Sequence, residues 1–454
     1  MSEAAVLDRP APVAQPSAAP GAATQTCDVM VIGGGPGGST IAALLAQRGR
    51  DVVLLEKEQH PRFHIGESLL PLNMPLFEKL GVRDEIHAIG MPKYGVEFVS
   101  PWHDKPMMLE FAEAWDKAYP SAYQVRRSEF DHVLFKNAAA KGARTFEQAR
   151  ASKVEFNEAG ARVMVRTEQG EQAWQAKFVV DASGRDTMLA GQLGSKRKNP
   201  KHNSLALFAH FENAQRLEGR KEGNITVFWF DHGWFWMIPL ADGTTSIGAV
   251  CWPYYMKSRK GSLEDFFRDT VALCPALAAR LKDATMVGGV TATGNYSYEG
   301  TRAAGQNYLM VGDAFAFIDP VFSTGVYLAM NSGFTGADVV ETCLDHPAQA
   351  AQALKKYDAT MRHGPKVFSW FIYRVTNPNL RDLFMDEGAH TWVKSGVISV
   401  LAGDVFRNSP IGARILAFKL VYYLNNLVKP LRGFSAWRRR KHIIRETAGE
   451  AAAS

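Results

Sequence analysis

The chain has 454 residues, of which 46% are hydrophobic and 22% charged, and its formal net charge is +6. This length exceeds what one hydrophobic core usually serves and indicates two or three subdomains of an ordinary globular protein. The sequence shows neither an apolar run of about 18 residues, as a bilayer span requires, nor a nucleic-acid-binding motif beside its modest charge.

Residues 1–26 are rich in Ala and Pro and lack the cationic start and apolar stretch of a secretory signal. This composition predicts a disordered tail. The four cysteines are scattered without a CxxC pair, which favours neither a disulfide framework nor a metal site and is typical of a reducing compartment. We therefore expect a cytoplasmic protein that holds no metal.

The first ordered segment reads as strand, glycine turn, helix and second strand. Gly33, Gly35 and Gly38 form a GxGxxG fingerprint directly after the apolar run from Val29 to Ile32. In this pattern the first glycine makes the tight turn, the second lets the backbone approach a pyrophosphate, and the third allows close helix–strand packing. Glu56 ends the second strand at the spacing where an acid binds ribose hydroxyls. The segment predicts a dinucleotide site.

Further along the chain, short alternating segments near 154–156 and 163–167 precede a buried strand that ends in Asp181. Residues from about 205 to 250 are rich in strand patterns, and the chain is mostly helical from about Gly325 onward. We predict an α/β fold in which a Rossmann-like dinucleotide-binding domain is interleaved with a β-rich substrate domain and followed by a helical C-terminal region. The predicted boundaries are a tail at 1–26, a module at 27–345 (dinucleotide-binding parts about 27–95, 124–190 and 295–345; substrate sheet about 96–123 and 191–294) and helices at 346–454.

Two later motifs indicate which dinucleotide binds. Asp181 opens the DASGR motif, and Gly312 and Asp313 end a further strand. A carboxylate at Asp313 suits the ribityl hydroxyls of a flavin, although the same residue is also a good helix N-cap. With all three motifs in order, residues 27–345 resemble the FAD-containing aromatic hydroxylase superfamily. The resemblance implies FAD as cofactor, bound by Asp181, Gly312 and Asp313 together with the glycine turn.

Within that superfamily, one segment resembles the flavin-dependent halogenases. GWFWMIP contains Trp234, Trp236, Ile238 and Pro239, which match the WxWxIP motif of that family. Tryptophans two residues apart lie on the same face of a strand. There they would separate the flavin from the substrate, so that oxygen is not transferred directly. Two ordinary core tryptophans are the competing interpretation.

Lys93, in MPKYGVEF, falls where these halogenases have their essential lysine, downstream of the matching segment from Phe63 to Pro71. Its role would be to hold an oxidised halogen by hydrogen bonding or by forming a haloamine. Partial burial would lower the pKa of the amine and favour the second route. An ordinary surface lysine is the alternative.

The segment FIDPVFSTGVYLAM resembles the FxxPxxSxG pattern of halogenases that act on phenols and pyrroles. In that family, backbone N–H groups at Thr324 and Gly325, after Ser323, bind chloride or bromide. Halogenases of free tryptophan have a glutamate where this chain has Phe322. The resemblance therefore favours a phenol or pyrrole substrate, free or tethered to an acyl carrier protein.

Several polar residues are weaker candidates. Arg127 resembles an arginine that flavoproteins place against the cofactor, with Gln124 as a less specific candidate. Among His103, His210 and Glu97 the sequence gives no basis for choosing a general base.

The resemblance implies an FADH2-dependent halogenase that receives reduced flavin from a separate NAD(P)H flavin reductase, since the chain shows no second nucleotide motif. An aromatic hydroxylase, a prenyl-chain reductase of related fold and a non-catalytic flavin-binding protein are the alternatives. The C-terminal segment has the pattern of amphipathic helices and contains a basic run from Trp437 to Arg445. This pattern is typical of helices packed on the core, of a surface that binds a partner or a membrane, or of a lid over a channel.

Overall fold

The predicted Rossmann-like sheet forms around the glycine-turn segment. Its central strand, β1, pairs in parallel with β2 on one side and with β10 on the other, and β7 and β19 extend these pairings outward. The strands of this sheet and its hairpin extensions are β1 (Gln25–Ile32), β2 (Val52–Leu55), β7 (Arg144–Phe146), β8 (Arg150–Asn157), β9 (Gly160–Thr167), β10 (Gly170–Asp181), β18 (Ala304–Gly305) and β19 (Tyr308–Met310).

The computed structural model describes residues 25–294, 297–388, 391–432, 434, 435 and 438. Residues 1–24 of the predicted tail therefore lie outside the described residues, as does the basic run except for Arg438. β1 begins at Gln25, inside the predicted tail 1–26, because Gln25 and Thr26 pair with strand β10.

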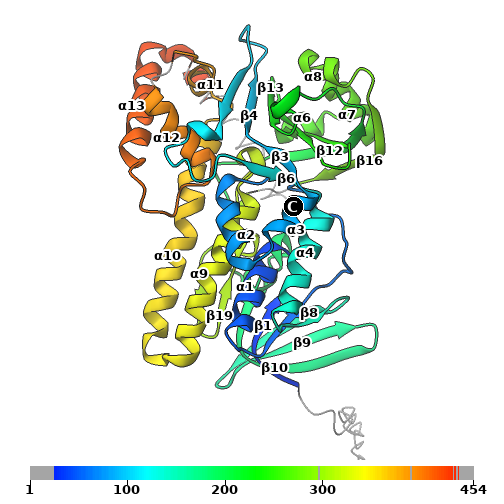
Figure 1. Cartoon of the computed structure of the whole chain (residues 1–454), viewed down its shortest axis with the longest axis vertical. Helices are drawn as coiled ribbons and strands as arrows, with labels where there is room; N and C mark the ends of the chain where they lie inside the picture. Colours follow the sequence, from blue (N-terminus) through cyan, green and yellow to red (C-terminus); the bar gives the residue numbers. More distant parts are fainter. Residues whose placement is uncertain (1–24, 295–296, 389–390, 433, 436–437, 439–454) are drawn as a thin grey trace, which may run out of the picture.

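A second sheet lies in the other half of the elongated molecule (Figure 1). It combines a strand pair from 95–110 with strands from 205–293, so the chain crosses between the two sheets more than once. In sheet order its strands are β16 (Thr285–Thr293), β12 (Leu205–Glu212), β15 (Thr245–Cys251), β14 (Gly233–Pro239), β13 (Ile225–Phe230), β4 (Gly95–Val99) and β5 (Met107–Glu110). Two small sheets join β3 (Met91–Lys93) to β6 (Ala122–Gln124), and β11 (Lys196–Lys198) to β17 (Tyr298–Gly300) and β20 (Ala316–Phe317).

Side-chain alternation gives the two faces of the second sheet different neighbours. Phe235 and Met237 of β14 belong to an apolar cluster that includes Phe266 and Phe267 of helix α7. The intervening Trp234 belongs to the main core shared with the first sheet. The helices on the outer face are α6 (Pro253–Lys257), α7 (Leu263–Ala272) and α8 (Pro275–Arg280).

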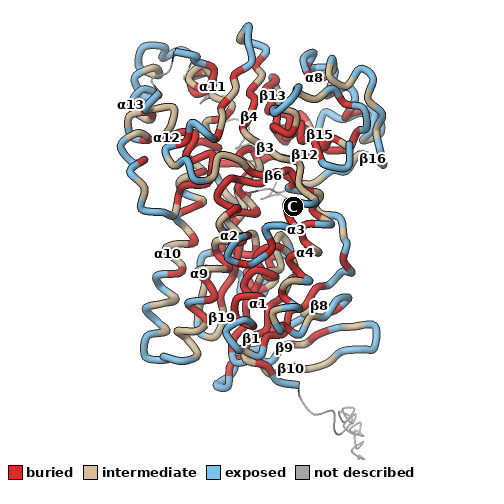
Figure 2. The backbone as a smooth tube through the Cα atoms, in the orientation of Figure 1, coloured by how far each residue is buried: buried red, intermediate tan, exposed pale blue. Residues whose placement is uncertain are grey.

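Helices cover the first sheet and form the C-terminal region. Figure 2 shows the interior strands buried in both halves, whereas much of the outer surface of the C-terminal helices is exposed. The remaining helices are α1 (Pro36–Gln47), α2 (Met74–Leu80), α3 (Arg83–Ile89), α4 (Arg127–Ala140), α5 (Met188–Gln192), α9 (Gly325–Asp345), α10 (Pro347–Ile372), α11 (Pro378–Phe384), α12 (Thr391–Leu401) and α13 (Gly412–Val428). The predicted α/β class, with two sheets and a helical C-terminal region, is confirmed. In the part of the chain that the structure describes, no helix is both long and apolar enough to cross a membrane.

Candidate functional site

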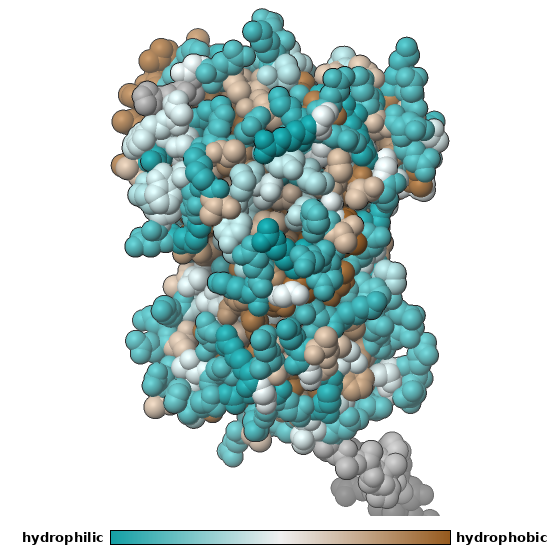
Figure 3. Space-filling view, in the orientation of Figure 1, coloured by the Kyte–Doolittle hydropathy of each residue, from teal (hydrophilic) through white to brown (hydrophobic). Residues whose placement is uncertain are grey.

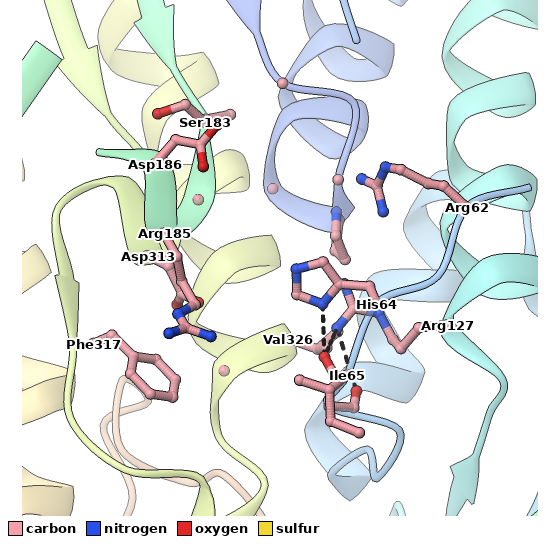
Figure 4. A pocket seen from close by; sticks show the side chains of 18 of the residues that line it. Arg62, His64, Ile65, Arg127, Ser183, Arg185, Asp186, Asp313, Phe317 and Val326 are labelled. Carbon is pink, nitrogen blue, oxygen red and sulfur yellow. Dashed lines mark hydrogen bonds between the residues drawn. The ribbon is translucent and has the colours of Figure 1, made fainter. Parts of the chain in front are cut away.

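A cavity of about 740 Å³ lies between the two sheets. Its wall combines the glycine turn, the segment 62–68, the DASGR loop, strand β14 and the start of helix α9. Figure 4 shows Arg62, His64 and Arg127 facing Arg185 and Asp313 across it. Its volume falls within the range of about 300–1,000 Å³ that is usual for ligand pockets.

Steric contacts explain why the turn before α1 needs glycine. Gly33 has φ +110°, and a Cβ there would lie 2.3 Å from the carbonyl oxygen of Ala182. A Cβ on Gly38 would lie 1.9 Å from the Gly33 oxygen, so Gly38 permits the close helix–strand packing expected of the third glycine. A Cβ on Gly35 would meet only the tip of Arg62, at 3.7 Å. The N-terminus of α1 thus faces open space, where its N–H groups and partial positive charge suit a pyrophosphate.

Glu56 is buried on the cavity wall at the end of β2. Its Oε2 accepts hydrogen bonds from the Gly34 N–H and from Arg62, both at 3.1 Å, and its Oε1 accepts one from the Glu58 N–H at 3.0 Å. These donors fix the carboxylate beside the glycine turn, at the place where an adenosine ribose would follow the pyrophosphate.

An arginine–aspartate cluster extends this wall. Asp131 is fully buried and bonds both Arg127, at 2.8 and 3.1 Å, and Arg62, at 3.0 Å. Burial opposes ionisation of Asp131, but the two guanidinium groups outweigh it and lower the pKa of the carboxyl. Arg127, predicted as a cofactor contact, lines the cavity and also donates to the Ile65 carbonyl at 2.8 Å. Sequence reasoning missed Arg62 and Asp131, although Asp131 lies four residues after Arg127 on one helix face.

Besides Gly38, which packs against Gly33, two predicted cofactor contacts do not lie on the cavity wall. The carboxylate of Asp181 accepts hydrogen bonds from the N–H groups of Ser183 and Leu189, at 2.9 and 2.7 Å, so it shapes the DASGR loop instead. Gly312, with φ +54°, packs against Ala329 of α9 and donates its N–H to Ser332 at 2.9 Å. Both predictions require this correction, because backbone donors and helix packing already use these groups.

The neighbouring Asp313 does line the cavity. Burial raises the pKa of its carboxyl to about 6, although the positive charges of Arg127 and Arg185 act to lower it. Arg185 from the DASGR loop also lines the cavity and donates to the Thr293 hydroxyl and the Gly294 carbonyl, both at 2.7 Å. His64 faces the same space, and burial, followed by the charge of Arg127, lowers the pKa of its ring to about 4. Sequence reasoning had not singled out either Arg185 or His64.

These features fit FAD. Gly33 and Gly38 leave no room for a Cβ, an open helix N-terminus lies next to them at Gly35, and an anchored carboxylate follows at the end of β2. A second carboxylate, Asp313, lies across the cavity, where a ribityl chain offers hydroxyl donors. The cofactor prediction and the chemistry of this wall therefore agree.

Lys93 is buried at the end of β3, with an exposed fraction of only 1%. Its Nζ donates to the Ser68 hydroxyl at 2.9 Å and to the Leu69 carbonyl at 3.1 Å, and it lies 5.3 Å from the centre of the Phe111 ring. Burial lowers the pKa of this amine from 10.5 to about 7. Lys93 itself is not part of the cavity wall, but Ser68 is. Lys93 thus reaches a residue of the cavity wall through the serine hydroxyl, a contact that the sequence did not indicate.

Strand β14 brings Trp234, Trp236 and Ile238 to the cavity wall, whereas Pro239 ends the strand outside it. The two indole rings have centroids 6.1 Å apart, and the Trp236 Nε1–H donates to the Ser246 hydroxyl at 3.1 Å. A Cβ on Gly248 of the adjacent strand would lie 2.1 Å from the Trp236 ring. The indole thus fills the space that this glycine leaves open, which holds it in place.

The predicted halide segment also forms part of the wall. Ser323 has a left-handed backbone, with φ +56°, and Thr324 is the N-cap of the long helix α9. Ser323, Thr324 and Gly325 line the cavity, with the N-terminal N–H groups of α9 beside them. A helix N-terminus at this point suits a small anion. Phe322, by contrast, is buried away from the cavity against Phe371.

Of the residues considered as general bases, His210 comes nearest to the cavity. Its Nε2 lies 2.9 Å from Oε1 of Glu67, a buried carboxylate on the cavity wall whose Oε2 has no hydrogen-bond partner among the described residues. Glu97 is bonded to Arg280, and His103 bonds Ser100, in both cases away from the cavity. Gln124 is not part of the wall either, although its backbone pairs with that of Ser68, and its side chain donates to the Gly223 carbonyl at 3.0 Å.

Comparisons with known proteins agree with this site. The family model described as an FAD binding domain matches residues 26–363. The 1H-pyrrole-2-carbonyl-[peptidyl-carrier protein] chlorinase of Pseudomonas fluorescens is 30% identical over 84% of this chain and 89% of its own length. The tryptophan 2-halogenase of Chondromyces crocatus is 35% identical over 72% of this chain, which matches 64% of that longer protein. Among solved structures, the myxobacterial chondrochloren halogenase is 31% identical in sequence and has a TM-score of 0.75, with 89% of this chain and 96% of the other covered.

Proposed function

Because the chain belongs to the flavin-dependent halogenases, within the FAD-binding family, we propose that it uses FADH2, O2 and chloride or bromide to halogenate an electron-rich phenol or pyrrole. One observation carries this proposal. The same cavity is lined by the glycine turn for FAD, by the paired indoles and by the N-terminus of α9. The Lys93 amine donates a hydrogen bond to Ser68, which is a residue of the wall of this cavity.

FAD would be held by the glycine turn, Glu56 and Asp313, with Arg62 and Arg127 supplying positive charge near its phosphates. When bound in its reduced form, FAD supplies, together with O2, the two-electron oxidation of the halide. The protein contributes positioning and exclusion of water. The N–H groups at Thr324 and Gly325 would hold the halide at the start of α9.

Trp234 and Trp236 would keep the organic substrate away from the flavin side of the cavity. Both side chains are almost fully buried, and their rings contact each other on one face of β14. Only a species as small as hypohalous acid then passes to the substrate side. This separation favours halogen transfer over direct insertion of oxygen.

Lys93 would receive the oxidised halogen. With a pKa near 7, the amine is available in both protonation states at neutral pH. The protonated form can donate a hydrogen bond to the oxygen of hypohalous acid and polarise it. The neutral form can react with hypohalous acid to give a haloamine and water. In either case the aromatic carbon then takes the halogen, loses its proton and leaves the amine unchanged. Ser68, a residue of the cavity wall whose hydroxyl accepts from Lys93, would carry or gate this contact.

For the substrate, Phe322 stands where halogenases of free tryptophan have a glutamate, which favours a phenol or pyrrole. The chlorinase relative named for a pyrrole on a peptidyl carrier protein supports a carrier-tethered substrate. The tryptophan 2-halogenase relative makes indoles the second class to test. A separate NAD(P)H flavin reductase would supply FADH2 in the cytoplasm.

The test is incubation with chemically or enzymatically regenerated FADH2, bromide or chloride, and a panel of phenols, pyrroles and indoles, both free and carrier-bound. Mass spectrometry should detect the isotope pattern of a halogenated product. A product that gains oxygen instead, with NAD(P)H consumed in the absence of any reductase, would identify an aromatic hydroxylase. Absence of any substrate-dependent product across the panel would support a non-catalytic flavin-binding protein.

A further inference from the structure

An exposed apolar face runs along α13 and the helical residues that follow it. Eight hydrophobic side chains there are exposed, and the exposed fractions of Leu427, Val428 and Leu431 are 76, 77 and 84%. We call this surface the C-terminal apolar face; its residues are Leu416, Leu420, Val421, Tyr423, Leu424, Leu427, Val428 and Leu431. Their spacing of three to four residues places most of them on one side of a helix. In Figure 3 hydrophobic atoms gather at the upper left, over the position of α13 in Figure 1.

The opposite side of α13 is well anchored, so the exposure does not come from a loosely attached helix. Ile415, Phe418 and Tyr422 are buried there. The Phe418 ring stacks on Phe371 of α10 at 5.9 Å, and Tyr422 meets Trp370 edge-on at 5.4 Å. The helix therefore buries one apolar face against the protein and presents a second apolar face outward. A soluble helix packed on a core needs only the first.

The sequence around α13 is rich in positive charge. From residue 405 to residue 445 it contains ten Lys and Arg residues and no Asp or Glu, although Arg407 pairs with Asp116 and with the preceding Asp404. Among the described residues, Lys429 and Arg432 approach one carboxylate, Asp382 of α11, at 4.0 and 3.1 Å. One acid thus faces two cations, and the rest of the segment adds further positive charge.

We infer that the C-terminal apolar face docks on the surface of an anionic phospholipid membrane. A helix with an exposed apolar face and flanking cationic side chains lies in the plane of a bilayer, with its apolar residues among the acyl chains and its cations at the headgroups. The cytoplasmic leaflet carries the negative charge that such a segment requires. The helix would rest on the membrane without crossing it.

Two other occupants fit the same observations less well. A second copy would bring two cationic segments that lack acids into contact, because a two-fold interface apposes identical surfaces. An acidic carrier protein would deliver its substrate to the cavity, yet no residue beyond Val326 is part of the described cavity wall. The inference does not depend on the halogenation reaction.

Vesicle co-sedimentation of the full chain tests it directly. The wild-type protein should bind vesicles of phosphatidylcholine mixed with phosphatidylglycerol, but not vesicles of phosphatidylcholine alone, and high salt should weaken binding. The double variant Leu427→Glu/Leu431→Glu should lower the vesicle affinity about tenfold or more, because two apolar side chains that would enter the bilayer are lost and two charges that the anionic lipid repels are added. The matched control Leu273→Glu/Val287→Glu changes two exposed apolar residues on the second sheet and its helices and should bind as the wild type does.

Thermal unfolding should be nearly the same for all three proteins, since the altered side chains are exposed. Equal vesicle binding by the wild type and the Leu427→Glu/Leu431→Glu variant would overturn the role of the apolar face. Failure of the wild type to bind anionic vesicles would overturn the inference. So would light scattering that shows a dimer dissociated by these substitutions, or saturable binding to an acidic carrier protein that the same substitutions abolish.

Discussion

Replacing Lys93 by methionine removes the amine but keeps most of the volume of a fully buried side chain. We expect halogenation to be lost while FAD still binds, since Lys93 is not part of the cavity wall that would hold the cofactor. We also expect a change in stability that depends on pH. Because burial depresses the pKa of Lys93 in the folded state, the protonated amine destabilises the fold, and this penalty is complete below the folded pKa of about 7.

As pH rises from about 7 toward 10.5, the folded chain has released the Lys93 proton but the unfolded chain still binds it. Wild-type stability therefore gains about 1.36 kcal/mol for each pH unit in this window, relative to a chain without the amine. Between pH 7 and about pH 9.5, the free energy of unfolding of Lys93→Met should fall relative to the wild type by about 3 kcal/mol. The variant also loses the hydrogen bonds to Ser68 and Leu69. That loss lowers its free energy of unfolding at both pH values, so it largely cancels when the two values are compared.

Urea unfolding of both proteins without cofactor, at these two pH values, measures the difference. Fluorescence quenching of bound FAD and mass spectrometry of the product complete the assay. The reasoning would be refuted if Lys93→Met still produced halogenated product at near wild-type rates. It would also be refuted if the stability difference between the two proteins were the same at both pH values, because the amine would then be fully hydrated in the folded state.

Further substitutions test other parts of the site. Gly38→Ala should weaken FAD binding and destabilise the fold, because the added Cβ would lie 1.9 Å from a carbonyl oxygen. FAD titration and thermal unfolding measure both effects, and Gly191→Ala, which has open space around it, is the control. Asp131→Asn should lower the free energy of unfolding by about 3–5 kcal/mol in urea, since the buried guanidinium of Arg127 loses the carboxylate that pairs with it and Arg62 keeps only Glu56. Ser68→Ala should slow halogenation without changing FAD affinity, as measured by single-turnover kinetics and fluorescence titration, and Ser68→Thr should restore the rate because it restores the hydroxyl. Trp236→Ala should yield less halogenated product and more oxygenated product or free hydrogen peroxide for each reduced flavin consumed. An unchanged ratio of these products would argue against a separating role for the Trp236 ring.

The local chemistry of the site could be predicted from the sequence, because each motif is short and its geometry is set by neighbouring residues. The turn at Gly33 is required by its positive φ and by the approach of Ala182. Period-two alternation along a strand is enough to place Trp234 and Trp236 on one face of β14. The family resemblance then supplied the cofactor and reaction class, which the comparisons with known proteins confirm.

Contacts between distant segments could not be predicted in this way. Asp181 has the residue type of a cofactor ligand, but the N–H groups of Ser183 and Leu189 use its carboxylate. Arg62 approaches Asp131, 69 residues later, only because the segment before α2 folds against α4. The pairing of Glu67 with His210 likewise joins a loop of the first half to a strand of the second sheet.

The sequence by itself determined the elements, the flavin cradle and the candidate lysine, since these depend on backbone sterics and on side-chain type over a few residues. Only the tertiary structure decided that Lys93 is fully buried behind Ser68 and that α13 keeps a second apolar face exposed. The physical reason is that burial is a property of what packs against a residue. The sequence neighbours of a residue are the same whether water, protein or lipid surrounds its side chain. The packing of remote segments therefore sets the pKa of Lys93 and decides which apolar residues of α13 stay exposed.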